Sequence, residues 1–289
     1  MSNPPMRRTI VGEVRPSQAL TTYGIGSLVD LPRISALVMG LEDWQQNLSD
    51  EINEPRLLAS AKKMLGDQLS SFRSPPRGPE EHGRGGSPWD ESRLVGIPVA
   101  PFPRWMVCPR CHLLAPLSSE LFIAKADPFR PEATQYQHDC GRTGSKPVAV
   151  VPARLLLTCE RGHLDDFPWV YFVHGGTTDC AYRLSMLEFG VGGEMADVTI
   201  KCNECGKKRR LSDAFGPLAR DQFPGCTARH PHLRDSDAAG CNSNTLRAVA
   251  LGASNLWFPM LISALSIPRA DDALGILIDE HWSNLSVHL

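Results

Sequence analysis

The sequence lacks the features of a membrane-spanning or exported protein. It contains no run of about eighteen apolar residues, the minimum for a transmembrane helix. The segment from Met1 to Thr9 includes two arginines, but no apolar stretch follows them as a secretory signal would require. We therefore expect the protein to reside in the cytoplasm.

The sequence also lacks an excess of charge of one sign and the short motifs of common enzymes. It has 30 lysines and arginines against 32 aspartates and glutamates, a formal net charge of −2, so any surface for nucleic acid has to be local. The patterns GxSxG, HExxH and Walker A do not occur. With 289 residues, 42% of them hydrophobic, the chain can bury one large core or two smaller ones.

Cysteine is the informative residue type, because its spacing is typical of metal ligands. The chain has nine cysteines, and four of them form the CxxC pairs Cys108-Pro109-Arg110-Cys111 and Cys202-Asn203-Glu204-Cys205. Without an export signal, reduced metal-bound thiolates are favoured over disulfides. Gly206 follows the second pair and can adopt the positive φ that turns backbone N–H groups towards the sulfurs. We predict two structural zinc sites, one around each pair.

The second CxxC pair has two later cysteines as partners. The predicted ligand set is Cys202, Cys205, Cys226 and Cys241. A site made only of thiolates leaves no open coordination position, so it supports structure rather than hydrolysis. His230 and His232 lie close enough in sequence to replace one sulfur. Cys180 has no CxxC partner, and we expect it to be a small buried side chain.

The first pair leaves its fourth ligand open. The candidates for the first three ligand positions are Cys108, Cys111 and Cys140. Three other residues compete for the fourth position, namely Cys159, His138 and His163. We favour Cys159, because a predicted strand ends there and Gly162 follows in a knuckle-like turn. Cys159 and His163 would also make a ligand pair of their own, which would leave Cys140 without a role.

A basic run follows the second knuckle. Lys207, Lys208, Arg209 and Arg210 are consecutive, and Lys201 precedes the knuckle. Such a cluster can contact nucleic-acid phosphates through a sequence-independent, salt-sensitive attraction. Two plainer interpretations are a solvated hairpin tip and a set of charges that balances the negative charge of a zinc tetrathiolate.

A metal-dependent hydrolase is the alternative reading of the segment around His163, Asp165 and Asp166. An imidazole and paired carboxylates could surround a metal with an open position. However, His163 can instead serve zinc, and the two aspartates can cap a turn before Pro168. We therefore expect no catalytic residues.

The periodicity of the chain predicts an α+β fold. Residues 1–73 form an N-terminal segment with one amphipathic helix, which starts at Asn53-Glu54-Pro55 and carries apolar positions up to Phe72. Residues 74–92 are rich in proline and glycine and indicate a linker or loop. Residues 93–289 form a strand-rich, zinc-bearing body with a strand near 148–158 that Pro152 breaks and another near 197–201. They end in a helix capped by Asp271 or Asp272.

Several motifs in a fixed order carry a family resemblance across almost the whole chain. They are Arg15-Pro16-Ser17-Gln18, Thr21-Thr22-Tyr23-Gly24, Leu28-Val29-Asp30-Leu31-Pro32, Phe102-Pro103-Arg104-Trp105, Pro152-Ala153-Arg154, the stretch from Cys159 to Trp169, the second CxxC knuckle, Gly252-Ala253-Ser254-Asn255 and Ser266-Ile267-Pro268. In this order they resemble the DrmB family, the DUF1998-containing component of the bacterial DISARM anti-phage system.

The resemblance implies a non-catalytic partner of the helicase-type ATPase DrmA. That pair would engage phage DNA alongside a DNA methyltransferase that marks self, and zinc binding by the cysteines is in keeping with the family. Family members are usually much longer, and the resemblance covers what corresponds to their first half. A stand-alone DNA-binding zinc module is the second functional hypothesis.

Overall fold

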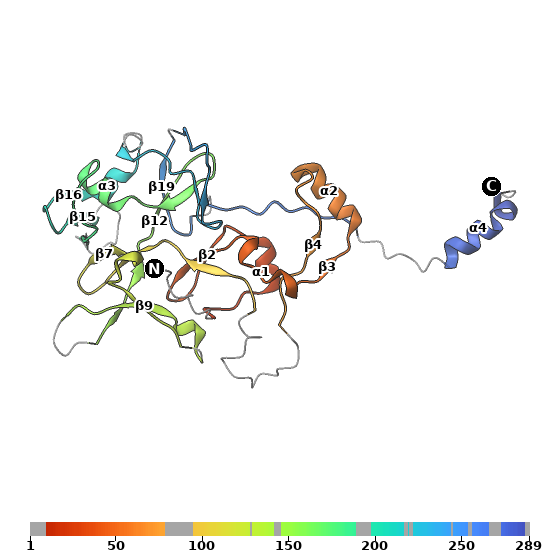
Figure 1. The fold of residues 1–289 in the computed structure, drawn as a ribbon, viewed down its shortest axis with the longest axis horizontal. Helices are drawn as coiled ribbons and strands as arrows, with labels where there is room; N and C mark the ends of the chain where they lie inside the picture. Colours follow the sequence, from red (N-terminus) through yellow and green to blue (C-terminus); the bar gives the residue numbers. More distant parts are fainter. Residues whose placement is uncertain are drawn as a thin grey trace. The chain divides into compact units, whose positions relative to one another are not determined.

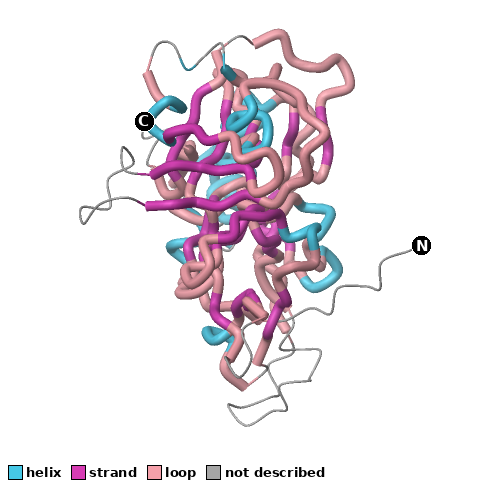
Figure 2. Tube along the Cα trace, turned by 90° about the vertical axis from the view of Figure 1, so that its left-hand side faces the viewer, coloured by secondary structure: helices cyan, strands magenta, loops and turns pink. Residues whose placement is uncertain are grey.

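The computed structural model describes residues 10–78, 95–127, 129–141, 146–188, 198–216, 219, 222–243, 245–253, 256–265 and 273–286. Strands outnumber helices, which confirms a mixed α+β fold with a strand-rich body (Figure 1). Figure 2 shows the same balance, with strands in magenta and helices in cyan. Within these residues, no helix is both long and apolar enough to cross a bilayer.

The chain divides into two compact units, and each is built from two separate segments. Unit 1 comprises Met1–Ser49 and Pro75–Pro259, and unit 2 comprises Asp50–Ser74 and Met260–Leu289. The linker predicted at 74–92 lies outside the described residues from position 79 onwards.

Unit 1 contains a six-stranded antiparallel sheet. Its strands, in spatial order, are β11 (Val151–Pro152), β6 (Trp105–Val107), β7 (Leu113–Pro116), β14 (Leu184–Glu188), β15 (Val198–Cys202) and β16 (Lys208–Arg210). The predicted strand 148–158 is interrupted as expected, because Pro152 has no N–H to donate and lies in the edge strand β11. The strand predicted near 197–201 is confirmed as β15.

Smaller sheets complete unit 1. They are β1 (Leu28–Asp30), β2 (Ser35–Val38) and β5 (Val99–Pro101); β13 (Leu164–Asp166), β12 (Leu155–Thr158) and β19 (Arg247–Ala250); β10 (Val148–Ala149), β9 (Gln135–His138) and β8 (Ile123–Lys125); and the hairpin β17 (Arg229–His230) and β18 (Asp235–Ser236). Every strand pair is antiparallel, so short turns can deliver ligands at strand ends.

The main core lies around the helix α3 (Trp169–His174). Phe167 is fully buried, and its ring contacts those of Trp169 and Phe172 at centroid distances of 4.6 and 5.2 Å. The same core includes Leu157 of β12 and Ile200 of β15, so it joins the six-stranded sheet to the β12 sheet. The other helices of unit 1 are α1 (Pro16–Thr21) and the 3-10 turns η1 (Leu41–Asp43), η2 (Gln46–Leu48), η4 (Leu117–Ser119), η5 (Pro131–Ala133) and η7 (Leu211–Ala214).

Unit 2 contains α2 (Pro55–Leu65), the pair β3 (Glu51–Ile52) and β4 (Phe72–Arg73), and α4 (Ala273–Leu285). The predicted helix start at Pro55 is confirmed, although the N-cap is Glu54 without a side-chain capping bond. The helix is shorter than predicted, because Gly66 at φ 76° ends it and Phe72 lies in β4. The C-terminal helix is confirmed, while Asp271 and Asp272 lie outside the described residues.

Candidate metal centres

All nine cysteines gather in three clusters of three. The clusters are Cys159, Cys226 and Cys241 with His163; Cys180, Cys202 and Cys205 with His174; and Cys108, Cys111 and Cys140. In each cluster the ligand atoms lie within 4.8 Å of one another, and every cysteine is a free thiol. We refer to them as the Cys159, Cys202 and Cys108 centres.

This grouping differs from the one predicted. The expected set of Cys202, Cys205, Cys226 and Cys241 is divided between two centres, and Cys159 lies with Cys226 and Cys241 rather than with Cys108. The reason is topological. Strand β15 delivers its cysteine within the six-stranded sheet, whereas β12 delivers Cys159 within a different sheet.

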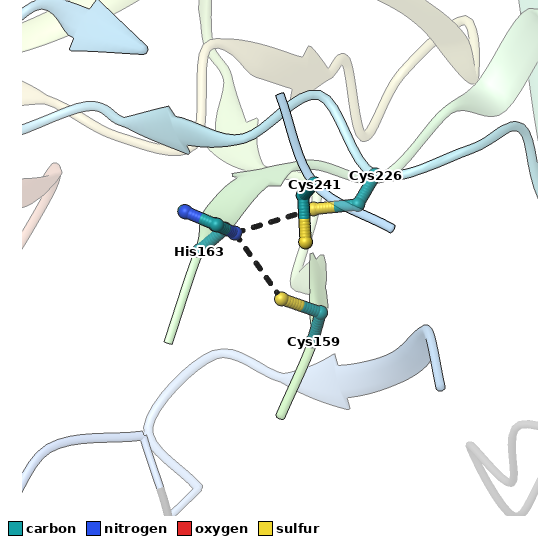
Figure 3. A group of neighbouring side chains, drawn as sticks. All are labelled: Cys159, His163, Cys226 and Cys241. Atoms are coloured by element: carbon teal, nitrogen blue, oxygen red, sulfur yellow. Dashed lines mark hydrogen bonds between the residues drawn. The ribbon is translucent and has the colours of Figure 1, made fainter. Parts of the chain in front are cut away.

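The first half of the Cys159 centre is a tight turn between β12 and β13. The N–H of Gly162, at φ 84°, donates to the carbonyl of Cys159 at 3.0 Å. This turn brings His163 back over the cysteine, so that its Nδ1 lies 3.4 Å from the Cys159 Sγ and 3.5 Å from the Cys226 Sγ. The three sulfurs and the imidazole face a common point (Figure 3).

The other two sulfurs come from segments on either side of the β17–β18 hairpin. The N–H of Ala228 donates to the Cys226 Sγ, and the N–H of Ser243 donates to the Cys241 Sγ, each at 3.4 Å. Each donor lies two residues after its cysteine, the arrangement that stabilises thiolates in zinc knuckles.

A carboxylate orients the histidine of this centre. The Nε2–H of His163 donates to Asp237 Oδ2 at 2.8 Å, and His230 Nε2 donates to the other oxygen at 3.0 Å. With its proton on Nε2, His163 presents the Nδ1 lone pair to the sulfurs, as metal-bound histidines with a carboxylate partner do. Burial opposes protonation of His163, but the hydrogen bonds to Asp237, Cys159 and Cys241 together outweigh it and raise the pKa of the imidazole.

The thiols of the centre cannot all ionise by themselves. Burial, together with the neighbouring thiols, raises the pKa of Cys226 to about 12, whereas the backbone N–H of Ser243 lowers that of Cys241 to about 7. A divalent cation removes this conflict, because it stabilises every thiolate at once. Three thiolates and one imidazole are a donor set of structural zinc, with no coordination position left open.

The Cys202 centre is built on the C-terminus of α3 and the knuckle after β15. Gly206, at φ 77°, donates its N–H to the carbonyl of Cys202 at 3.1 Å, which confirms the knuckle turn expected there. The Nδ1–H of His174 donates to the carbonyl of Val170 at 2.7 Å, which leaves its Nε2 facing the Cys205 Sγ at 3.4 Å. The backbone N–H of Lys207 lowers the pKa of Cys205.

Two members of this centre were not predicted as ligands. Cys180 was expected to be a buried side chain without a partner, but it is half-buried and belongs to the cluster. His174 was noted only beside the hydrolase alternative. The number of cysteines could have indicated this grouping. Nine cysteines divide evenly into three groups of three, whereas two groups of four leave one cysteine over.

The Cys108 centre has three thiols and no histidine among the described residues. The Sγ atoms of Cys108 and Cys140 lie 3.7 Å apart. Burial raises the pKa of Cys111 to about 12, whereas at Cys108 burial is outweighed by backbone N–H groups together with the Cys111 and Cys140 thiols, which lower its pKa. His138, a predicted candidate for the fourth ligand, instead bonds the carbonyl of Leu121 through Nδ1 at 3.0 Å.

The residues of the hydrolase alternative do not converge on an open site. The Nε of Arg104 lies 2.6 Å from an oxygen of Asp166, and Arg229 Nη1 lies 2.8 Å from one of Asp165. Both carboxylates, on β13, are therefore committed to arginines. His163 faces the sulfurs with one nitrogen and Asp237 with the other.

The basic run has two faces. Lys208 and Arg210 are exposed on β16, whereas Arg209 points inwards, with its guanidinium 4.6 Å from the centroid of the Phe172 ring. Arg209 also donates to the carbonyl of Phe172 at 2.8 Å and to the side chain of Gln222. Arg209, one of the four residues predicted to bind phosphate, therefore packs against α3 instead.

These features define a class of protein: a strand-rich body in which clusters of cysteine and histidine join the ends of separate sheets. Comparison with known proteins makes the assignment more specific. Residues 15–258 match a domain of unknown function, DUF8724, and the chain therefore belongs to that family. It is also 32% identical over 240 residues to the DISARM protein DrmB of Bacillus paralicheniformis.

The match to DrmB covers 81% of this chain and 36% of the relative, so the chain spans about a third of that protein's length. The resemblance inferred from the ordered motifs is thereby confirmed.

Proposed function

We propose that this chain is a non-catalytic, zinc-stabilised subunit of an anti-phage defence complex of the DISARM type. The observation that carries the proposal is the similarity to a DISARM component over 240 residues. The matched family region, residues 15–258, contains all nine cysteines. The three centres add a physical rationale, because they join segments rather than surround an open reaction site.

Zinc is the metal that the donor sets favour. Three thiolates with one imidazole match tetrahedral structural zinc sites, and at the Cys159 centre Cys226 and Cys241 each accept a backbone N–H. We assign one zinc ion to the Cys159 centre and one to the Cys202 centre. The Cys108 centre, with three thiols in the described part of the chain, would hold an ion more weakly.

The proposed partners follow from the resemblance and from the exposed cations. A helicase-type ATPase of the DrmA kind would bind the subunit, and Lys208 and Arg210 would contribute to contact with DNA. The alternative, a stand-alone DNA-binding zinc module, is favoured only by those same exposed cations.

A defence assay tests the proposal. Cells that carry the remaining DISARM components would be challenged with phage in the presence of this chain, of its Cys159→Ala variant, or of neither. We expect the intact chain to restore protection by at least tenfold in plaque number and to co-purify with the ATPase. Protection that is the same without the chain would contradict the proposal. DNA binding without any association with the ATPase would favour the stand-alone module.

A further inference from the structure

The register of strands β14, β15 and β16 places particular side chains on one face of the six-stranded sheet. Lys201 lies directly opposite Lys208, and Thr199 lies directly opposite Arg210. Opposed residues of antiparallel strands project to the same face, and alternate residues along a strand share it about 7 Å apart. Lys201, Lys208 and Arg210 therefore form a compact triangle on one face of the sheet, although Lys201 precedes the knuckle in the sequence and Lys208 follows it.

Burial identifies the opposite face as the core side. Val198, Ile200 and Cys202 of β15 are at most 7% exposed, and Arg209, opposite Ile200, packs on the ring of Phe172. The residues between them, Thr199 and Lys201, are half-buried, and Lys208 and Arg210 are exposed. The triangle thus lies on the side away from the main core. Ser185, opposite Lys201 on β14, shares this side of the sheet, and its hydroxyl donates to Asn203 Oδ1 at 2.9 Å.

In the described part of the chain, no acidic side chain pairs with the three cations of the triangle. Neither Lys201, Lys208 nor Arg210 forms a salt bridge there. Two acids close to these cations in the sequence are engaged elsewhere, because Asp213 pairs with Arg209 at 3.8 Å and Glu204 accepts the N–H of Ala181 at 2.9 Å. Like charges directly opposite one another destabilise a strand pair, so the Lys201–Lys208 pair favours an anion between them.

The basic run therefore divides by role. Lys207 acts on the Cys202 centre, because its backbone N–H and its charge lower the pKa of Cys205. Arg209 supports α3 through its contacts with Phe172. On β16 itself, Lys208 and Arg210 face outwards, and the register adds Lys201 to them although it lies outside the run.

We propose that Lys201, Lys208 and Arg210 form a phosphate-binding face for the backbone of double-stranded DNA, with Thr199 as an accessory donor. This rests on the proposed contact with DNA and specifies its surface. No aromatic residue occurs among the paired positions of this face, so base stacking contributes nothing to it. Cations and a hydroxyl are the groups that contact phosphates without reading sequence.

The test is a salt titration of DNA binding by the full chain. Fluorescence anisotropy would be measured with a labelled 20-base-pair duplex of arbitrary sequence, for the wild type and for the triple variant Lys201→Gln, Lys208→Gln, Arg210→Gln. A second triple variant, Arg56→Gln, Lys62→Gln, Lys63→Gln, makes the same charge change on exposed positions of α2. A charge-preserving variant, Lys201→Arg, Lys208→Arg, Arg210→Lys, and zinc content serve as folding controls.

We expect the face variant to lower affinity at least tenfold in 0.1 M salt. The slope of log K against log salt should fall by roughly 2.7, the value for three phosphate contacts, while the α2 and charge-preserving variants keep the wild-type slope. Equal slopes for the face and α2 variants would overturn the phosphate-binding face and leave DNA contact by the chain intact. A wild type that does not bind the duplex would instead refute the DNA contact itself. If the wild type bound polyglutamate as tightly as the duplex, the face would be a site for polyanions in general rather than for DNA.

Discussion

The Cys159 and Cys108 centres each contain three thiols, but the ligands of the Cys159 centre are farther apart in the sequence. His163 and Cys226 are separated by 63 residues, whereas Cys108 and Cys140 are separated by 32 and follow strands β6 and β9 of two different sheets. The Cys159 centre also has a histidine held by Asp237. A metal at the first centre would join segments that are far apart in the sequence, whereas a metal at the second would join segments that are closer in the sequence.

The β17–β18 hairpin, which lies between Cys226 and Cys241 in the sequence, contacts the segment that follows β2. The carbonyl of His232 accepts the N–H of Gly40 at 2.8 Å, and Arg234 pairs with Asp43 at 2.7 Å. A Cβ on Gly40 would lie 2.7 Å from a methyl of Leu233, so the two segments pack closely. The Cys159 centre therefore positions the contact between the hairpin and the segment after β2.

The largest expected effect is the loss of a Cys159 ligand. Cys159→Ala should remove one zinc ion and lower the free energy of unfolding by about 5 kcal/mol, because metal binding at a structural site contributes directly to folding. Amide hydrogen exchange at Gly40 should become faster. The matched variant at the other centre, Cys111→Ala, should cost less than half as much in chemical denaturation. Equal destabilisation by the two variants would contradict the comparison.

The next effect concerns the carboxylate behind the imidazole. Asp237→Asn should weaken zinc binding at the Cys159 centre by about 10–100-fold, because the neutral amide no longer fixes the tautomer of His163 or raises its basicity. Competition with a fluorescent chelator measures this. Asp235→Asn, on the same hairpin, is the control, since its Oδ1 accepts the N–H of Ser236 rather than that of His163. Similar affinities for the two variants would exclude the orienting role.

A smaller effect is expected from the inward cation of β16. Arg209→Met should lower the free energy of unfolding by about 1–2 kcal/mol, because it removes the contact with the Phe172 ring and a hydrogen bond to that residue's carbonyl. Arg210→Met, one residue further on the exposed side, should change it by less than about 0.5 kcal/mol. Urea denaturation distinguishes them, and the reverse order would show that the assignment of faces is wrong.

The smallest effect is at the knuckle glycine. Gly206→Ala should cost about 1 kcal/mol, because alanine is strained at φ 77° even though a Cβ there meets no atom. Gly96→Ala, where φ is not positive and the space is also open, should have little effect on thermal unfolding. A Gly206→Ala variant as stable as wild type would mean that the knuckle tolerates another backbone conformation.

Local features of the molecule were predictable from the sequence. The CxxC spacing and Gly206 indicated a knuckle, and the apolar pattern around Val198 indicated the strand that carries it, because both depend on residues close together in the chain. The helix start at Pro55 followed from the same kind of local signal. The broken strand at Pro152 followed from the missing N–H of proline.

The grouping of ligands was not predictable from spacing. Which distant cysteines join Cys202 depends on α3 ending beside β15, and this is decided by the packing of Phe172 and its neighbours in the core. The inward direction of Arg209 could have been anticipated, since alternate residues of a strand face opposite sides. The role of Asp237 could not, because it follows from a tertiary contact across 74 residues.

Metal counting in paired variants tests the central assignment most directly. Zinc per chain would be measured by elemental analysis for Cys202→Ser, Cys226→Ser and the double variant, purified without added metal. Because the two cysteines belong to different centres, each single variant should lose one ion and the double variant two. A double variant that loses only one ion would place both cysteines at a single site and contradict the account.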